Sequence, residues 1–342
     1  MLFVETRGSW REMGRQYGEA TREMLRRGIG YFGKWMLEDP QKTAKVAGRL
    51  RHDTLPVAKA VAEEIEGIAQ GADLPVDTVW CYRFLPECAA ALQMGCTVVA
   101  LADSDRGPIL ARNDDIEPDL SVEIQVCHTS RPTDGPASMV LTYAGFLAGG
   151  AAMNEHGLAV GGASAHTTVP YAGGQAPFSV FFHLLLQRSE NIAHFVRKFG
   201  ELTYYGKPAI VLMADDSGQS MALEMQPGQT LTRTPRQAGR DWQVCTNQYI
   251  QGVERIAPET EYLQNSYARY GRLTHRLGDW PMERTVENVR KLMAEVAAPG
   301  FCIPEQGLRL RTAYTSIFEL KHRKMVLLDG HPATAPMREI SL

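Results

Sequence analysis

Long apolar runs are missing from this chain of 342 residues, in which no stretch of about 18 apolar residues occurs. A membrane-spanning helix needs about 20 predominantly apolar residues, so none is predicted. The first residues lack a basic region followed by an apolar stretch, so no secretory signal is predicted either. A formal net charge of −3 gives no reason to expect binding to nucleic acid or to an acidic membrane surface. Together these absences predict a cytoplasmic protein without a membrane or nucleic-acid partner.

Cysteine is scarce, and its spacing is irregular. Without an export signal, six scattered cysteines predict neither a disulfide framework nor a CxxC zinc site, and we expect reduced thiols. The nine histidines form no HExxH element and no pair at metal-ligand spacing, so no metal site is predicted. Glycine-rich phosphate-binding loops and the Gly-x-Ser-x-Gly element of serine hydrolases are also missing, and no cofactor is predicted. The cysteines are Cys81, Cys88, Cys96, Cys127, Cys245 and Cys302.

The first 95 residues are predicted to be mostly helical. The composition of the whole chain, 44% hydrophobic and 22% charged, is ordinary for a globular protein with a substantial core. Apolar side chains recur at three- and four-residue steps over residues 10–24, as in an amphipathic helix. Gly14 and Gly18 weaken this helix, so we expect them to mark close packing against a neighbouring element.

A second helix is predicted over residues 56–71, with Asp53 or Thr54 as its cap and Gly71 as its C-terminal stop. From Cys96 onward the pattern changes to strands with a few helices, which indicates a layered α+β fold with helices covering antiparallel sheets. The predicted strands are 96–101, 109–111, 122–126, 139–143, 209–215, 220–225, 316–319 and 325–328, and the later helices are 178–199, 262–277 and 285–296.

A predicted β-hairpin carries the most informative feature, the dipeptide Gly95-Cys96. Apolar runs over residues 96–101 and 109–111 flank a turn rich in Asp, Gly and Pro, which is the pattern of two paired strands. The second run continues into Arg112-Asn113-Asp114-Asp115. Because the strands would be antiparallel, the Cys96 thiol and this polar cluster are expected to be neighbours. A nucleophile beside a guanidinium and carboxylates suits acyl-group chemistry.

These residues also have simpler interpretations. A cysteine at the start of a strand is most often a small buried hydrophobe, and a charged cluster at a strand end is often a solvated turn. Gly95 favours chemistry, because glycine permits strained backbone at a turn where the thiol could attack the preceding peptide bond. Cleavage there would give Cys96 an α-amino group with a pKa of about 7.7–8.0, a general base within the same residue. Arg112 could then favour the thiolate, and a neighbouring Asp could orient the amine.

Two asparagines are further candidates. Asn154, within residues 153–158, belongs to a good turn sequence that needs no chemistry. Asn247 follows an apolar run and could donate its side-chain amide to an oxyanion, although turn formation is at least as common. The residue pattern alone leaves both interpretations open.

Seven motifs, each weak alone, follow one another along the chain: residues 8–18, residues 63–71, Gly95-Cys96-Thr97, residues 111–115, residues 153–158, Thr246-Asn247 and residues 266–270. In this order they resemble the peptidase C45 family, the acyl-coenzyme A:6-aminopenicillanate acyltransferase-like proteins. That family belongs to the N-terminal nucleophile hydrolases. The resemblance covers most of the chain.

The resemblance implies a set of site residues. Gly95-Cys96 matches the self-cleavage site, and Cys96 would be the nucleophile. The Arg-Asn-x-Asp pattern makes Arg112 and Asp115 its partners, with Asp114 as the intervening residue. Asn247 would supply the oxyanion-hole amide.

Other positions match less closely. Ser316 occupies the conserved C-terminal strand of the family, and Glu319 stands near where relatives usually have Asp. Ser164 follows the 153–158 motif where relatives often carry Asn. A serine hydroxyl is shorter than an amide, so the second oxyanion donor is the open question of this sequence.

The resemblance also implies an αββα sandwich that matures by cleavage. A helical leader segment (residues 1–95) would stay packed on the catalytic β segment (residues 96–342), in which an acyl-Cys96 intermediate would form. Hydrolysis of a small N-acyl amide and acyl transfer share that intermediate, with a coenzyme A thioester as one acyl donor. An uncleaved, non-catalytic small-molecule-binding protein on the same fold is the alternative, and a homo-oligomer is left open.

Overall fold

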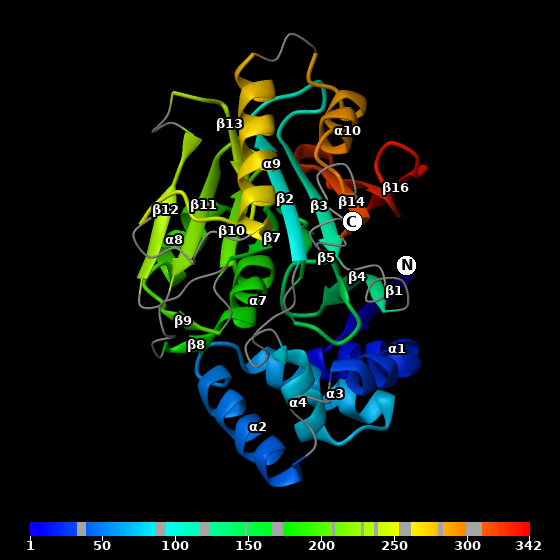
Figure 1. The fold of residues 1–342 in the computed structure, drawn as a ribbon. Helices are drawn as coiled ribbons and strands as arrows, with labels where there is room; N and C mark the ends of the chain where they lie inside the picture. The colour runs from blue at the N-terminus through cyan, green and yellow to red at the C-terminus, as the bar shows by residue number, and fades with distance from the viewer. Residues whose placement is uncertain are drawn as a thin grey trace.

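The computed structural model describes residues 1–32, 39–85, 94–116, 124–147, 149–165, 174–206, 209–226, 229–235, 239–252, 261–279, 283–298 and 310–342. Two large sheets pack face to face, with helices on both outer faces (Figure 1). Helices α1 to α4 gather at one end of the molecule, while α9 and α10 cover the outer face of the smaller sheet (Figure 1). This is the predicted α+β arrangement of helix, sheet, sheet and helix layers.

The eight-stranded sheet is antiparallel except at one edge, where β1 pairs with β4 in parallel. In spatial order its strands are β1 (Leu2–Gly8), β4 (Gln125–Pro132), β5 (Ser138–Tyr143), β6 (Ala151–Asn154), β7 (Ala159–Ser164), β10 (Ala209–Ala214), β11 (Ser220–Gln226) and β12 (Gln229–Arg233). The parallel edge strand ties the N-terminus of the chain into a sheet made otherwise of later residues.

The six-stranded sheet is antiparallel throughout and contains the predicted hairpin at its centre. In spatial order its strands are β13 (Trp242–Cys245), β2 (Met94–Leu101), β3 (Ile109–Ile116), β14 (Arg311–Glu319), β15 (Lys324–Leu328) and β16 (Met337–Ser341). A separate short parallel pair joins β8 (Ala176–Pro177) to β9 (Tyr204–Tyr205).

The helices cover the outer faces of the two sheets. They are α1 (Trp10–Phe32), α2 (Pro40–Thr54), α3 (Lys59–Ala72), α4 (Val76–Arg83), α7 (Phe178–Arg188), α8 (Ile192–Phe199), α9 (Glu261–Gly278), α10 (Val286–Ala294) and the short 3-10 helix η5 (Leu320–His322). Three apolar clusters fill the spaces between the layers: one between α1–α8 and the larger sheet, one between the sheets, and one beneath α9 and α10. Burial of these clusters is the main driving force for the layered fold.

Helices α1 and α3 approach closely through glycine, as Gly14 and Gly18 predicted. A Cβ atom on Gly14 or Gly18 would overlap the backbone of α3, and one on Gly67 or Gly71 would overlap the backbone of α1. The four glycines therefore allow two helix backbones to touch, which offsets their low helix propensity. The prediction of close packing is confirmed.

The predicted ends of the second helix were wrong. Asp53 and Thr54 belong to the last turn of α2, and the Thr54 carbonyl accepts hydrogen bonds from the two residues that lead into α3. Gly71 lies inside α3, which ends at Ala72 and is capped by Asp73 in a left-handed conformation with φ of 56°. Tertiary packing of the glycine thus outweighed its use as a stop.

Two further element predictions need correction or lie partly outside the described residues. The helix predicted over 178–199 is interrupted at Ser189, which is extended, and Asn191 caps the new helix α8. The strand predicted over 122–126 includes residues outside the described ranges, and β4 begins at Gln125. The other predicted strands and helices are confirmed, but three are longer than predicted: α1 continues to Phe32, β3 continues to Ile116, and β14 begins at Arg311.

Candidate active site

Strands β2 and β3 place the candidate nucleophile directly opposite the polar cluster. In their antiparallel register, Cys96 pairs with Asp114 and Val98 pairs with Arg112. Side chains alternate along a strand, so Cys96, Arg112 and Asp114 share the face directed at the larger sheet. Arg112 Nε donates to the Gly162 carbonyl of β7 on that side at 2.9 Å. The predicted hairpin and the proximity of its thiol to this cluster are both confirmed.

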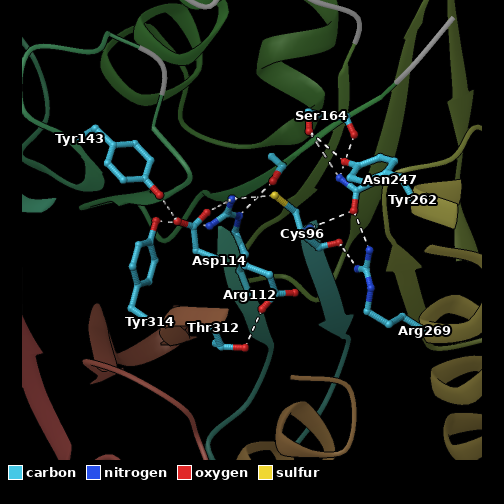
Figure 2. A network of polar contacts seen from close by, with 12 residues as sticks. Cys96, Arg112, Asp114, Tyr143, Ser164, Asn247, Tyr262, Arg269, Thr312 and Tyr314 are labelled. Carbon is cyan, nitrogen blue, oxygen red and sulfur yellow. Dashed lines mark hydrogen bonds and ion pairs between the residues drawn. The ribbon is translucent and has the colours of Figure 1, made fainter. Parts of the chain in front are cut away.

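The Cys96 thiol is buried and lies beside a guanidinium (Figure 2). Arg112 Nη2 donates to Cys96 Sγ at 3.1 Å and to Asp114 Oδ1 at 2.6 Å. Burial raises the pKa of the Cys96 thiol, and the Arg112 charge acts in the opposite direction. The guanidinium is therefore placed to stabilise a thiolate that burial alone would disfavour.

The backbone of Cys96 is held by two other long-range partners. Its N–H donates to Asn247 Oδ1 at 2.9 Å, and its carbonyl accepts from Arg269 Nη1 at 2.6 Å. Arg269 Nη2 also donates to Asn247 Oδ1 at 2.8 Å, so the three residues form a closed set of contacts (Figure 2). Asn247 Nδ2 donates to the Ser164 carbonyl at 2.8 Å. Asn247 thus links the start of β2 to the end of β7.

The loop that carries Asn247 is fixed by buried hydrogen bonds. Asn247 N–H donates to Ser266 Oγ of α9 at 2.7 Å, and Thr246 Oγ1 donates to Gln248 Oε1 at 2.6 Å. A short bond also joins Ser266 to Gln248. These buried hydrogen bonds hold the loop, and with it the Asn247 side-chain amide, in one orientation.

Asp115 faces Gly95 across the hairpin, on the side opposite the thiol. Its Oδ1 accepts from Thr312 Oγ1 at 2.6 Å, and burial raises the pKa of its carboxyl group to about 6, with Arg269 acting in the opposite direction. A Cβ on Gly95 would lie 3.0 Å from the Asp115 Cβ and 3.1 Å from Leu310 Cδ1. A side chain at position 95 would therefore crowd Asp115 and Leu310.

The conformation expected for Gly95 was wrong. It lies within strand β2 rather than at a turn, and it is not among the glycines with positive φ. The argument for a backbone that only glycine can adopt does not apply here. Instead, a larger residue at position 95 is disfavoured because its Cβ would crowd the Asp115 side chain.

Asp114 is the centre of a second buried network (Figure 2). Besides the ion pair with Arg112, its Oδ2 accepts from Tyr143 OH at 2.5 Å. Burial, and then the Asp114 charge, raise the pKa of Tyr143, so its phenol stays a donor. Tyr314 OH accepts from Arg112 Nη1 at 3.2 Å. These contacts fix the guanidinium against the thiol.

Among the described residues, two further candidates, Asn154 and Ser316, make no side-chain hydrogen bond to the residues around Cys96. Asn154 makes four side-chain bonds to backbone groups: Nδ2 donates to Leu186 O and Ser189 O, and Oδ1 accepts from His156 N and Leu158 N. This is the geometry of a turn support. Ser316 is buried on β14 directly opposite Arg112, and its Oγ has no hydrogen-bond partner among the described residues.

Arg269 lies within the motif at residues 266–270 but was not predicted from the sequence to belong to the site. The signal was the spacing in α9: Tyr262, Ser266 and Arg269 are separated by four and three residues, which places them on one helix face. All three side chains contact residues of the site. Tyr143 and Tyr314 gave no such signal, because their contacts depend on how the two sheets pack.

Within the described ranges of the chain, no group of three or more His, Cys, Asp or Glu side chains could hold a metal ion. No helix of those ranges is long and apolar enough to span a bilayer.

Two sheets between helical layers, with a buried thiol near the start of a central strand, define the fold of the N-terminal nucleophile hydrolases. The chain belongs to the family of acyl-coenzyme A:6-aminopenicillanic acid acyl-transferases, whose model matches residues 102–334, about two thirds of the chain. Arg112, Asp115 and Asn247 lie within the matched span, which begins shortly after Cys96.

Solved structures support the fold at low sequence identity. Penicillin V acylase from Agrobacterium tumefaciens is 16% identical, with a TM-score of 0.52 over 72% of this chain and 86% of that chain. A mutant conjugated bile acid hydrolase from Clostridium perfringens is 12% identical, with a TM-score of 0.50 over 72% of this chain and 92% of that chain. No curated protein sequence matches this chain. The family is named for acyl transfer, and these neighbours are named as an acylase and a hydrolase.

Proposed function

We propose that this chain is a cysteine amidohydrolase or acyltransferase that acts on small N-acyl amides through an acyl-Cys96 intermediate. One observation carries the proposal: polar side chains hold the thiol, the N–H and the carbonyl of Cys96 simultaneously. Arg112 contacts the thiol, Asn247 the N–H and Arg269 the carbonyl. A cysteine that served only as core filler would still need partners for its buried N–H and carbonyl, but it would not need a guanidinium at its thiol.

Maturation begins with cleavage of the Gly95–Cys96 bond. The Cys96 sulfur attacks the Gly95 carbonyl carbon, the C–N bond breaks, and the amide nitrogen takes up the thiol proton. Water then hydrolyses the thioester, which releases the Gly95 carboxylate and restores the thiol. The product has a free Cys96 amine, and Asn247 Oδ1 already accepts from that nitrogen in the uncut chain.

In the catalytic cycle the new amine acts as general base. It takes the thiol proton while the sulfur attacks the substrate carbonyl, and Asn247 Nδ2 stabilises the resulting oxyanion. Collapse breaks the C–N bond, and the leaving amine takes the proton. Water completes hydrolysis, whereas a second amine completes acyl transfer, so both reactions use the same residues.

The remaining residues position these groups. Asp114 holds Arg112, and Asp115 lies beside the site of the new terminus, where its carboxylate orients the ammonium form. Ser164 supports the Asn247 amide through its carbonyl. The leader segment stays docked after cleavage, because β1 belongs to the larger sheet and α1 to α4 share its apolar core.

The proposal needs no cofactor, and a coenzyme A thioester is one acyl donor that could replace the amide in the transfer reaction. We place the enzyme in the cytoplasm, as the composition predicted. The non-catalytic alternative, a binding protein with Cys96 left internal, is separated from the proposal by the following test.

Intact-mass analysis of purified protein tests the proposal directly. Wild type should separate into two fragments, the second beginning at Cys96, and iodoacetamide should label that cysteine first. Cys96→Ala should remain one chain. Cys127→Ala is the matched control, since Cys127 is equally buried in the apolar cluster between the sheets and should not affect cleavage. A wild-type chain that stays whole, with an inert Cys96, would support the binding protein instead.

The raised pKa of Asp115 gives a second readout. Because its folded carboxyl group titrates near pH 6, the rate of p-nitrophenyl acetate hydrolysis should rise as the pH passes about 6. Asp115→Asn should remove this rise. An unchanged profile in the variant would exclude Asp115 as the group that orients the amine.

A further inference from the structure

A small cavity of about 60 Å³ lies between the leader segment (residues 1–95) and the outer face of the larger sheet. Along β4, His128 lines the cavity, while its neighbour Cys127 packs between the two sheets. Side chains alternate along a strand, so the cavity lies on the face of the sheet that points away from Cys96. The two segments share its walls: the leader contributes Trp10, Tyr17, Glu64 and Arg83, and the later segment contributes His128, His183 and Gln187.

Three of the side chains that line this cavity have polar atoms without a partner. Arg83 Nε and Gln187 Oε1 are buried and make no hydrogen bond within the described ranges of the chain. The ring of His183 contacts the ring of Trp10 at 5.1 Å, and among the described residues neither of its nitrogens has a hydrogen-bond partner. Buried polar atoms are nearly always paired, so a bound molecule is expected to complete these hydrogen bonds.

The residues that line the cavity carry no net charge. Arg83 Nη2 donates to Glu64 Oε2 in a short, buried ion pair, so the two charges offset each other. Burial lowers the pKa of His128 and of His183 to about 3, so both rings are neutral at neutral pH. Glu64 would repel an anion and Arg83 would repel a cation, and either ion would lose its hydration on entry. The cavity therefore favours an uncharged molecule.

The unpartnered atoms define which uncharged molecule fits. Arg83 Nε–H is a donor, Gln187 Oε1 is an acceptor, and the neutral His183 ring supplies one of each. An amide group has the matching carbonyl oxygen and N–H. One water needs about 10–15 Å³ of such a cavity, so the space suits a molecule about four waters in size. Acetamide is of that size, and the rings of Trp10 and Phe182 offer an apolar wall to its methyl group.

We propose that this cavity binds a small uncharged amide, which joins the leader segment to the rest of the chain. The ligand contacts Arg83 on the leader and His183 and Gln187 on α7 (Phe178–Arg188). Because it contacts both segments, it stabilises their docked arrangement whether or not the Gly95–Cys96 bond is cut. The inference therefore does not depend on the proposed acyl-Cys96 chemistry.

Three molecules of the same size and shape test the proposal: acetamide is neutral, acetate is an anion and acetamidinium is a cation. Titration of the full chain at constant ionic strength, followed by saturation-transfer difference NMR, measures each dissociation constant. Acetamide should saturate with a constant of about 0.1–10 mM, the range open to so small a ligand. Acetate and acetamidinium should bind at least about tenfold more weakly, because each brings an unpaired charge into the cavity.

Substitutions locate the bound amide. His183→Phe removes both ring nitrogens and keeps a ring against Trp10, so the dissociation constant of acetamide should rise about three- to tenfold. Val140→Leu, which narrows the cavity without removing a polar group, should raise it too. His275→Phe is the matched control at an exposed histidine and should leave it unchanged. Cys96→Ala should also leave it unchanged, since Cys96 lies on the other face of the sheet.

Three results would overturn the inference. An acetamide signal that grows linearly with concentration would mean that the cavity holds only water, and tighter binding of acetate would make it an anion site. Saturable binding that is lost in Cys96→Ala but unchanged in His183→Phe would place the amide at the candidate active site instead. The comparison of the three ligands uses the wild-type chain alone, so it stands even where a variant does not fold.

Discussion

Replacing Asp114 with Asn probes the buried ion pair beside the nucleophile. The change keeps the shape of the side chain but removes the charge that faces Arg112. In the native structure Asp114 Oδ1 lies 2.6 Å from Arg112 Nη2, and Oδ2 accepts from Tyr143 OH at 2.5 Å. Both members of the ion pair are almost completely buried.

The magnitude follows from this burial. Removing one partner of a buried pair leaves an uncompensated charge and costs about 3–5 kcal/mol. Asp216 pairs with Arg323 at 2.8 Å, but both side chains are about a third exposed. Since an exposed pair contributes about 0–1 kcal/mol, Asp216→Asn is the matched control.

Two assays test the reasoning. Urea unfolding should show that Asp114→Asn lowers the free energy of unfolding by about 3 kcal/mol or more, against less than about 1 kcal/mol for Asp216→Asn. Alkylation by iodoacetamide as a function of pH should show a lower pKa for the Cys96 thiol, because Asp114 raises that pKa and Arg112 lowers it. Equal stability losses for the two variants, or a thiol pKa that rises, would refute the account of this network.

Two further predictions concern two buried histidines and the cleavage site. Burial lowers the pKa values of His128 and His183 to about 3 from 6.5, so the unfolded chain binds more protons between these values. The free energy of unfolding should therefore fall as pH drops from 6.5 toward 3, by up to about 1.4 kcal/mol per pH unit for each histidine. Replacing both histidines with Gln should make the free energy of unfolding, measured with urea, depend less on pH. Replacing the exposed His275 with Gln should leave that dependence unchanged. The same dependence on pH in wild type and in both variants would contradict the assignment. Gly95→Ala should slow self-cleavage, because the alanine Cβ would crowd the Asp115 side chain on the facing strand. The fraction of intact chain over time measures this rate. Gly30→Ala is the control, since a Cβ there meets open space and the chain should cleave normally.

The sequence predicted the parts of the site that are close along the chain. The turn between the two apolar runs predicted the hairpin, and the hairpin brings Cys96 close to the polar cluster at residues 112–115. The sequence did not predict that Asp114, rather than Asp115, shares the face of the thiol; this follows from the strand register in the structure. In a hairpin, the turn and the apolar pattern of the two strands determine which residues pair. The order of motifs along the chain also predicted that Asn247 belongs to the site. Asn247 lies 151 positions from Cys96, and its side chain accepts a hydrogen bond from the Cys96 N–H.

The parts that were not predicted depend on how distant elements pack. Tyr143 reaches Asp114 only because the two sheets face each other, and neither residue signals this in its own strand. The parallel pairing of β1 with β4 joins segments more than 120 positions apart, and a short first strand gives no local evidence for it. Gly71 was misjudged for the same reason, since its role is set by the backbone of α1.

Trapping the acyl-enzyme tests the central claim most directly. Purified protein is mixed with p-nitrophenyl acetate, quenched in acid during the burst, and digested for mass spectrometry. We predict an acetyl group on the sulfur of Cys96, in a peptide whose first residue is Cys96, and its disappearance as turnover ends. An unmodified Cys96, still joined to Gly95 in protein that has been exposed to the ester, would contradict the account.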